Sequence, residues 1–303
     1  MKFVDSVREL IGETPLIKLD SKNSTILAKC EFLNPLGSIK DRVALNILEE
    51  AIERGEIDSE TLIIEATSGN TGIALSAIGA SLNLKIVIVM PESMSLERRS
   101  LMTHFGAKLI LTPAEKGMNG AIEKAEKIAK DSSNSFLTSQ FSNIDNPNIH
   151  FKKTAEEIWK DTDGKIDIFI AGVGTGGTLS GVGKFLKEKN PEIKIIAVEP
   201  KESAILSGEN PSPHKIQGIG AGFIPNNLNE EIYDEVVKVS GKDSIETARN
   251  LARRNGILVG ISSGANIFAS NLIGNRPENR GKIIVSTLND TGERYISTEL
   301  FEK

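Results

Sequence analysis

The sequence predicts an α/β protein with mostly parallel sheets, and three observations carry this prediction. Short β-branched runs alternate with amphipathic stretches along most of the chain, which is typical of parallel sheets covered by helices on both faces. The 303 residues are enough for two domains that each bury a core. Hydrophobic residues make up 39% and charged residues 25%, as in ordinary globular proteins.

The first alternation runs from residue 62 to residue 130. Aliphatic and β-branched residues predict strands at 62–66, 86–90 and 108–111. Apolar residues that recur three and four positions apart predict helices at 70–81, 96–105 and 115–130. Polar turn formers at 139–148 then break the rhythm, and we expect the chain to cross between two domains there.

A second alternation follows this crossing. It predicts strands at 166–173, 193–198 and 283–286, and helices at 177–187, 244–254 and 262–273. A glycine-rich bend at 217–225 interrupts it. Two α/β units that face one another would bind a ligand in the cleft between them, at the carboxyl ends of their strands.

Composition argues against several classes of function. A net charge of −5 without a dense Lys/Arg run argues against a nucleic-acid or anionic-membrane surface. Aromatic residues amount to only 5%, too few for a base-stacking platform. Asp5, Arg8 and Glu9 stand where a signal peptide would need an apolar run, and no apolar stretch could span a bilayer. We therefore expect a cytoplasmic protein without a membrane or nucleic-acid partner.

The single cysteine, Cys30, excludes an intrachain disulfide and any thiol cluster for a metal. It lies in the apolar run 26–32, which predicts a buried thiol in a strand rather than a nucleophile.

The segment 34–42 is the first with a chemical signature. Pro35 and Gly37 predict a turn, Ser38 is a candidate helix N-cap, and an apolar stripe follows. Lys40 then falls in the first turn of a helix, where the helix dipole disfavours positive charge and so favours the neutral amine that condenses with a carbonyl. The alternative is a solvated lysine paired with Asp41, or with the two glutamates at 49 and 50.

The segment 172–178 leaves a predicted strand and enters a predicted helix. Its four glycines allow successive backbone N–H groups to converge on an anion, and Thr175 and Thr178 add hydroxyl donors. This pattern predicts a phosphate-binding loop that is not a P-loop, because no lysine follows it.

A dinucleotide site is the rival interpretation of the same loop. Gly172, Gly174 and Gly177 spell G-x-G-x-x-G, and Glu199 follows about twenty residues later. The motif nevertheless falls in the middle of the chain, and an NAD-dependent dehydrogenase would give Lys40 no function. A carbonyl cofactor on Lys40 would absorb visible light and lose that colour with borohydride, whereas a dehydrogenase would be colourless.

The segment 67–72, Thr-Ser-Gly-Asn-Thr-Gly, again joins a predicted strand to a predicted helix. Its hydroxyls, carboxamide and N–H groups suit a carboxylate ligand. Capping of the helix by Ser68 or Asn70 is the simpler account. The alternative for Gln140 and Asn143 is a role as turn residues, and the alternative for the Ser262–Ser263 pair is capping of the next helix.

Together these segments resemble the cysteine synthase (O-acetylserine sulfhydrylase) family of pyridoxal-phosphate enzymes of fold type II. The matching stretches occur in order from about residue 5 to the C-terminus: 11–16 (Ile-Gly-Glu-Thr-Pro-Leu), 34–42, 67–72, 172–178, 215–222, 260–264 and 292–295 (Gly-Glu-Arg-Tyr). The resemblance implies a tryptophan synthase β-like fold: two three-layer α/β domains with pyridoxal 5'-phosphate in the cleft between them. The smaller domain would comprise residues 35–144, and residues 1–34 with 145–303 would form the larger one.

The resemblance also implies a role for each matching position. Lys40 would bond covalently to the cofactor, Asn70 would bind its phenolic oxygen, and Ser262 would face its pyridine nitrogen, although Ser263 is an alternative. Two further sets are implied. The phosphate would be held by Gly174, Thr175, Gly176, Gly177 and Thr178. The substrate carboxylate would be held by Thr67, Ser68, Gly69, Thr71 and Gln140, with the backbone of Gly218 near the substrate.

The implied reaction is a β-replacement that makes L-cysteine from O-acetyl-L-serine and sulfide. A neutral hydroxyl at the pyridine nitrogen would restrain the electron sink and favour loss of a β-substituent over transamination. Closure of the loop at 67–71 would exclude water. A homodimer and a serine acetyltransferase C-terminal tail are the implied partners.

Asn226 departs from the family pattern, which often has glycine at this position. A polar side chain there, near the expected cleft, leaves the identity of the donor substrate undecided. The same cofactor would also allow L-cysteine as the donor, with release of hydrogen sulfide and addition of water or a second amino acid.

Overall fold

The structure is a computed structural model that describes residues 3–67, 69–93 and 95–302. The chain forms two compact units. The first unit comprises Met1–Ile11 and Asn34–Asn146, and the second comprises Gly12–Leu33 and Pro147–Lys303. The chain passes from the first unit to the second between Asn146 and Pro147, inside the polar segment 139–148.

The first unit contains a parallel four-stranded sheet. Its strand order is β5 (Lys108–Thr112), β4 (Lys85–Pro91), β3 (Leu62–Ala66) and β6 (Ser135–Leu137). Its helices are α1 (Lys40–Glu53), α2 (Asn70–Ser81), α3 (Leu96–His104) and α4 (Gly117–Asp131).

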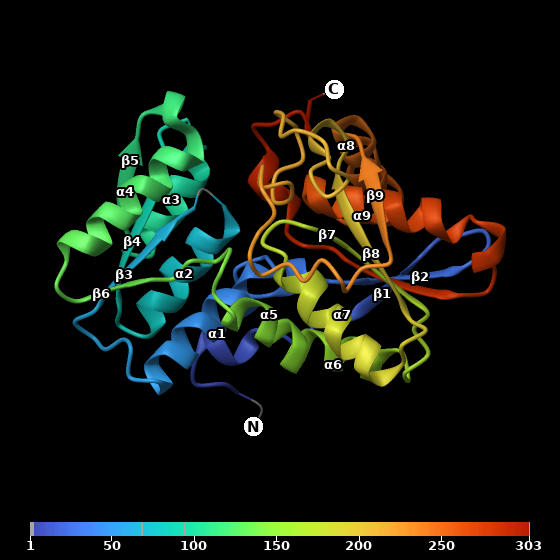
Figure 1. Ribbon diagram of the computed structural model, residues 1–303, viewed down its shortest axis with the longest axis horizontal. Coiled ribbons are helices and arrows are strands. Elements are labelled where there is room, and N and C mark those ends of the chain that lie inside the picture. The colour runs from blue at the N-terminus through green and yellow to red at the C-terminus, as the bar shows by residue number, and fades with distance from the viewer. Residues whose placement is uncertain (1–2, 68, 94, 303) are drawn as a thin grey trace. The chain divides into compact units, whose positions relative to one another are not determined.

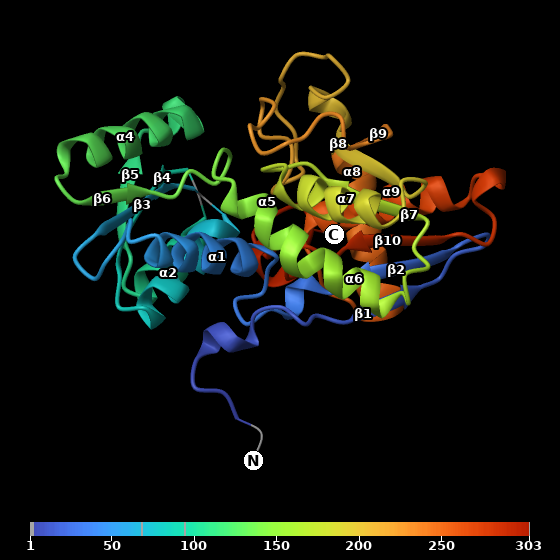
Figure 2. The same cartoon turned by 60° about the horizontal axis from the view of Figure 1, so that its bottom comes forward.

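Alternation along the strands divides the core of the first unit between two faces. Ile63 and Ile88 pack with apolar residues of α1, α2 and α3, whereas Ile64 and Val87 pack against α4. Figure 2 shows α4 on one side of this sheet and α1 and α2 on the other. The unit therefore has three layers, and every strand run is apolar on both faces.

The second unit contains a six-stranded sheet. Its strand order is β1 (Leu16–Leu19), β2 (Thr25–Lys29), β10 (Ile283–Thr287), β7 (Ile168–Gly172), β8 (Lys194–Pro200) and β9 (Glu235–Val239). All neighbouring strands are parallel except β1 and β2, which pair antiparallel (Figure 1). Its helices are α6 (Ala155–Asp161), α7 (Gly177–Lys189), α8 (Gly241–Asn250) and α9 (Ile261–Gly274), and the short helix α5 (Asp145–Ile149) leads into it.

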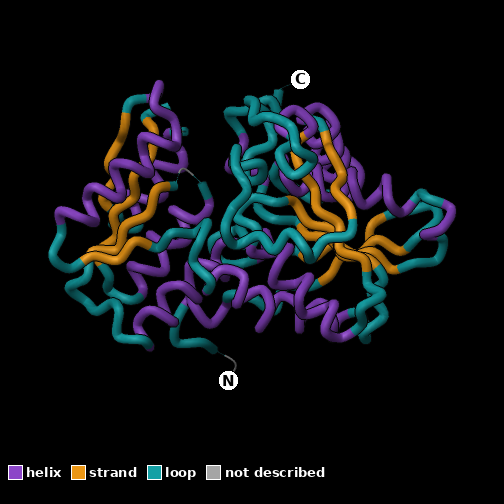
Figure 3. Tube along the Cα trace, viewed as in Figure 1, coloured by secondary structure: helices purple, strands orange, loops and turns teal. Residues whose placement is uncertain are grey.

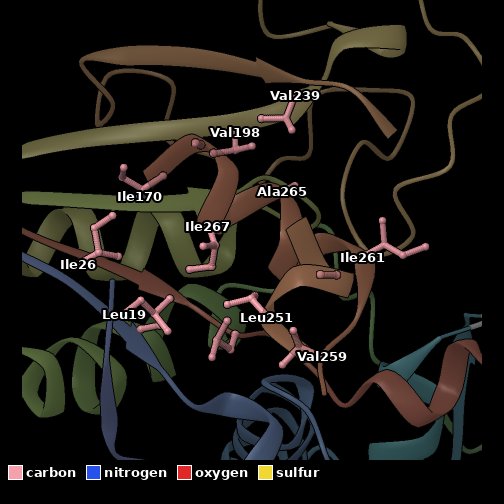
Figure 4. Close-up of a cluster of buried hydrophobic side chains, with 14 of the residues drawn as sticks. Leu19, Ile26, Ile170, Val198, Val239, Leu251, Val259, Ile261, Ala265 and Ile267 are labelled. Carbon is pink, nitrogen blue, oxygen red and sulfur yellow. The ribbon is translucent and has the colours of Figure 1, made fainter. Parts of the chain in front are cut away.

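Both faces of this second sheet are also covered. Ile170 and Val198 pack with Ala265 and Ile267 of α9 on one face (Figure 4). Phe169 lies on the other face, in a cluster with residues of α6 and α7. Full burial of such a side chain contributes about 1.5–3 kcal/mol, so these two clusters fix the ends of the strands, where the candidate site residues lie.

The predicted α/β fold with mostly parallel sheets is confirmed, with differences at particular elements. The predicted helix at 244–254 begins at Gly241, because the Ser240 hydroxyl accepts a hydrogen bond from the Asp243 N–H at 3.1 Å. Its end is a π-helical turn, Leu251–Asn255, closed by Gly256 at φ +68°. The segment 139–148 is not all loop, since α5 begins at Asp145.

The long connection between β8 and β9, residues 201–234, is mostly loop (Figure 3). Only a 3-10 turn, Lys201–Ser203, interrupts it. In the described part of the chain, no helix has the length and apolar character needed to cross a membrane.

Candidate active site

Lys40 is the first residue of α1. The preceding turn is organised by the buried carboxylate of Asp41, which accepts hydrogen bonds from the Leu36 N–H at 2.7 Å and from the Ser38 hydroxyl at 3.2 Å. The predicted N-cap is shifted, because Ile39 occupies that position without a side-chain bond, although the Ser38 hydroxyl accepts from the Lys40 N–H at 3.2 Å. Lys40 thus stands at the positive end of the α1 dipole, as the sequence predicted.

The glutamates proposed as alternative partners for Lys40 have basic partners of their own. Glu49 pairs with Arg8 at 2.9 Å, and Glu50 lies 3.9 Å from Arg54 one helical turn later. Both pairs are partly exposed and contribute little to stability.

The segment after β3 forms the other half of the first unit's candidate site. The Gly69 N–H donates to the Thr67 hydroxyl at 3.3 Å, and the Thr71 hydroxyl donates to Gln140 Oε1 at 2.7 Å. Gln140 follows β6, the neighbour of β3, so two adjacent strand ends bring these side chains together. Ser68 lies outside the described residues.

The N-terminus of α2 begins after a glycine rather than after a capping side chain. Gly69 is the N-cap residue and makes no side-chain cap bond, and Asn70 is the first helical residue. The interpretation of Asn70 as a helix cap is therefore wrong. The first N–H groups of a helix have no intrahelical partner, so this end suits an anion.

Glu65, which the sequence analysis did not single out, lies behind this site on β3. Its fully buried carboxylate accepts hydrogen bonds from the Thr138 hydroxyl and from Gln140 Nε2, the latter at 3.1 Å. Gln140 is thereby held between Glu65 and Thr71, with its orientation fixed at both ends of the amide. Burial raises the pKa of Glu65 to about 7, against the lowering effect of these hydrogen bonds.

This raised pKa predicts a pH-dependent stability. The folded chain retains a proton on Glu65 that the unfolded chain releases near pH 4.5. The stabilisation is therefore full below that pH and is lost as the pH rises through 7. At about 1.4 kcal/mol per pKa unit it amounts to roughly 3 kcal/mol. We expect Glu65→Gln to remove this loss, because a glutamine amide can accept from Gln140 and donate to Thr138.

Urea unfolding at a series of pH values between 4.5 and 8 would measure the effect. Glu60→Gln is the matched control, since Glu60 is an exposed carboxylate that pairs with Lys85. An equal decline in the free energy of unfolding for the wild type and Glu65→Gln would contradict the assignment to Glu65.

In the second unit, the glycine-rich loop between β7 and α7 forms a compact backbone cradle. A Cβ on Gly174 would collide with the carbonyl oxygen of Gly218. Gly176 has φ +80°, and a Cβ there would lie 2.7 Å from the Leu228 N atom. Gly176 is also the N-cap of α7 and makes no side-chain cap bond. The cradle therefore offers backbone N–H groups that no side chain covers, together with a helix N-terminus, and both suit a phosphate.

Gly218 connects this cradle to the start of α9. A Cβ on Gly218 would lie 3.5 Å from the Ser262 Oγ, so Gly174, Gly218 and Ser262 lie close together. The hydroxyl of the alternative residue, Ser263, accepts a hydrogen bond from the Asn289 N–H at 2.8 Å. Ser262 is therefore the serine of this pair that lies beside the glycine loops.

Two further side chains complete the description of the second unit. His150, not foreseen from the sequence, contacts the Thr178 hydroxyl through Nε2 at 3.3 Å and Thr154 through Nδ1 at 3.0 Å. Cys30 is 3% exposed and follows β2 rather than lying within it. Burial raises the pKa of its thiol to about 11, which keeps it protonated and a poor nucleophile.

The candidate residues thus form two groups, one in each unit. The first unit holds Lys40 and a helix N-terminus that suits a carboxylate, and the second holds a glycine cradle that suits a phosphate, beside a neutral hydroxyl. This donor set fits a phosphorylated heterocycle with an aldehyde: backbone N–H groups for the phosphate, a hydroxyl for a ring nitrogen and an amine for the carbonyl.

Comparisons with known proteins agree with this chemistry. The model of the family described as "Pyridoxal-phosphate dependent enzyme" matches residues 7–290. Cysteine synthase B of Campylobacter jejuni is 54% identical over 99% of this chain and 100% of its own length. The chain belongs to the cysteine synthase family of pyridoxal-phosphate-dependent enzymes. The resemblance inferred from the sequence is confirmed, and pyridoxal phosphate rather than NAD is the cofactor.

Solved structures of the cysteine synthase family are similar in fold over nearly the whole chain. A cysteine synthase from Entamoeba histolytica has a TM-score of 0.97 and 47% identity, covering 100% of this chain and 92% of that one. A hydrogen sulfide-producing enzyme from Fusobacterium nucleatum has a TM-score of 0.92 and 45% identity, covering 97% of this chain and 100% of that one. Both types of activity therefore occur on this fold among relatives of similar identity.

Proposed function

We propose that this enzyme makes L-cysteine from O-acetyl-L-serine and sulfide by pyridoxal-phosphate-dependent β-replacement. The observation that carries the proposal is the glycine cradle at the start of α7, which lies beside the neutral hydroxyl of Ser262. A hydroxyl restrains the electron demand of the ring, which favours elimination at the β-carbon over transamination. The similarity to named cysteine synthases supports the choice of substrates.

The residues of both groups would hold the cofactor. Gly174, Thr175, Gly176, Gly177 and Thr178 would bind the phosphate, Asn70 the phenolic oxygen, and Lys40 the aldehyde carbon. When bound, the cofactor supplies an electron sink for the substrate's α-carbon. Residues 35–144 would form the domain that carries Lys40 and the carboxylate site, and the cradle would belong to the other domain.

The first unit would bind the substrate carboxylate. Thr67, Gly69 and Thr71 lie around the N-terminus of α2, and these residues, together with Ser68, would bind the carboxylate. Gln140 would contribute its amide, with the Gly218 backbone near the substrate. Lys40 would take the α-proton before acetate leaves the β-carbon, and would return it after sulfide has added there. Glu65 would not contact the substrate, and would instead hold the Gln140 amide in place through a hydrogen bond.

Product analysis of the purified holoenzyme tests the proposal. With O-acetyl-L-serine and sulfide we expect stoichiometric L-cysteine and acetate, and with L-cysteine alone only slow release of sulfide. Absence of L-cysteine in the first reaction would overturn the assignment.

A second candidate reaction, with L-cysteine as donor and hydrogen sulfide as product, is favoured by one residue. Asn226 is exposed and lies two positions before Leu228, whose backbone packs on Gly176 of the cradle. A carboxamide in this place can hydrogen-bond a donor or an acceptor molecule.

Asn226→Gly should shift the ratio of sulfide release from L-cysteine to L-cysteine synthesis from O-acetyl-L-serine. We expect a change of about fivefold, equivalent to one hydrogen bond of about 1 kcal/mol. Both initial rates would be measured on the same preparation. Asn83→Gly is the control, because Asn83 is exposed and has φ +56°, which glycine tolerates. An unchanged ratio would exclude Asn226 from donor selection.

We further propose a cytoplasmic homodimer that binds the C-terminal tail of a serine acetyltransferase. The expectation for the family supports this proposal. Large apolar side chains in the N-terminal segment, which a second copy would cover, add to it: Phe3, Val4, Val7 and Leu10 are exposed.

A further inference from the structure

A chain of polar side chains in the second unit runs from the phosphate cradle to Ser262. It begins at the buried Asn266 on α9, whose Oδ1 accepts from the Gly172 N–H at 2.8 Å. It continues through Thr287 at the end of β10 and Asn289 just beyond, and it ends where Asn289 Nδ2 donates to Ser262 Oγ at 3.1 Å.

The hydrogen bonds of this chain run in one direction from its first member to Ser262. A backbone N–H can only donate, so the Asn266 oxygen faces Gly172 and its nitrogen faces Thr287. Asn266 Nδ2 donates to the Thr287 carbonyl oxygen at 2.9 Å and to its Oγ1 at 3.0 Å. The Thr287 hydroxyl, which receives this hydrogen bond, donates its own hydrogen to Asn289 Oδ1 at 2.7 Å.

The hydrogen bond donated by the Thr287 hydroxyl orients the amide of Asn289. Its oxygen is occupied as an acceptor from Thr287, so its nitrogen is the group directed at Ser262. The backbone of Asn289 is also held in place, because its N–H donates a hydrogen bond to Ser263 Oγ. Ser262 Oγ therefore serves as an acceptor toward Asn289. Within residues 3–67, 69–93 and 95–302, its hydroxyl hydrogen has no acceptor.

We propose that Asn289 is a positioning residue that sets the polarity of the Ser262 hydroxyl, so that Ser262 donates a hydrogen bond to an unprotonated ring nitrogen of the cofactor. The inference rests on the proposed function, in which Ser262 faces that nitrogen. A hydroxyl oriented in the opposite sense would accept from a protonated ring and would strengthen its electron demand. Asn289 would thus help to keep the chemistry at the β-carbon, without contacting substrate or cofactor.

The decisive variant is Asn289→Asp, because a carboxylate can only accept hydrogen bonds. Ser262 would then donate to the new carboxylate and would offer its lone pairs to the ring. With pyridoxal phosphate labelled with ¹⁵N at the ring, we expect the wild-type holoenzyme to show the ¹⁵N resonance of an unprotonated pyridine and the variant to show that of a pyridinium. We also expect the variant to form more of the aminated cofactor on incubation with substrate.

Asn190→Asp is the matched control, since Asn190 is exposed at the far end of α7 from the cradle and its oxygen already accepts from the Glu192 N–H. A second variant, Thr287→Val, removes the donor to Asn289 Oδ1 and serves if Asn289→Asp does not fold. It should weaken the affinity for added pyridoxal phosphate roughly two- to tenfold, as for one lost hydrogen bond, and should move the ¹⁵N resonance toward the protonated range.

The two possible failures can be told apart. A wild-type protein that binds no pyridoxal phosphate, or makes no L-cysteine, would overturn the proposed function. A wild-type enzyme that does both, with a ¹⁵N resonance unchanged by Asn289→Asp and by Thr287→Val, would overturn the role of Asn289 alone.

Discussion

Lys40→Ala should lower the rate of L-cysteine synthesis by at least about 10³-fold. The substitution removes the amine at the first position of α1, which would both bind the cofactor's carbonyl and move the α-proton. General acid–base catalysis alone contributes 10²- to 10⁴-fold. The cradle of the second unit should still bind the phosphate, so we expect the variant to take up pyridoxal phosphate without a covalent bond.

Borohydride reduction followed by peptide mass analysis measures the covalent bond directly. The wild type should carry the reduced cofactor on the peptide that contains Lys40, and Lys40→Ala should carry none. A small primary amine added to the variant should restore part of the activity. Lys85→Ala is the control, because Lys85 is an exposed lysine of the same unit that pairs only with Glu60 in the described structure. Full activity in Lys40→Ala would contradict the proposed mechanism.

Much of the fold could be predicted because its strands are buried on both faces. The runs at 62–66 and 283–286 are aliphatic apart from Glu65 and Ser286, and such runs have no alternative as surface elements. The prediction missed β1, β6 and β9. In β1 and β9 an exposed lysine interrupts the apolar pattern, and β6 has only three residues, too few for a pattern to be recognised. Some helix ends differ from the prediction because a capping hydrogen bond sets them, as at Ser240. Such a bond depends on local geometry that the apolar periodicity does not encode.

The candidate site was predictable where the chemistry depends on backbone. Gly174 and Gly176 are needed because any Cβ there meets Gly218 or Leu228, and such requirements leave glycines in the sequence. The supporting residues Glu65, His150 and Asn289 left no comparable signal. Each acts through side chains that are distant in sequence, as Glu65 does through Gln140, and only the folded chain brings such pairs together.

Gly176→Ala should nearly abolish cofactor binding, with an affinity for pyridoxal phosphate at least about 100-fold weaker. Two costs combine at this position. The backbone has φ +80°, which costs a residue with a Cβ about 1–3 kcal/mol. The new methyl would also lie 2.7–2.8 Å from the backbone of Leu228, and relief of this clash must displace either the loop or the start of α7. Either displacement misaligns the N–H groups that would bind the phosphate.

Gly208→Ala separates these two costs. Gly208 has a similar φ of +83° in the same unit, but a Cβ there meets no atom within 4 Å. It should lose about 1 kcal/mol of stability, from backbone strain alone, and should bind pyridoxal phosphate as the wild type does. Isothermal titration of the apoprotein measures the affinity, and urea unfolding measures the stability. Equal affinities of Gly176→Ala and Gly208→Ala for pyridoxal phosphate would contradict the prediction. The clash with Leu228 at position 176 would then have no effect on cofactor binding, and the phosphate could not be held at Gly176.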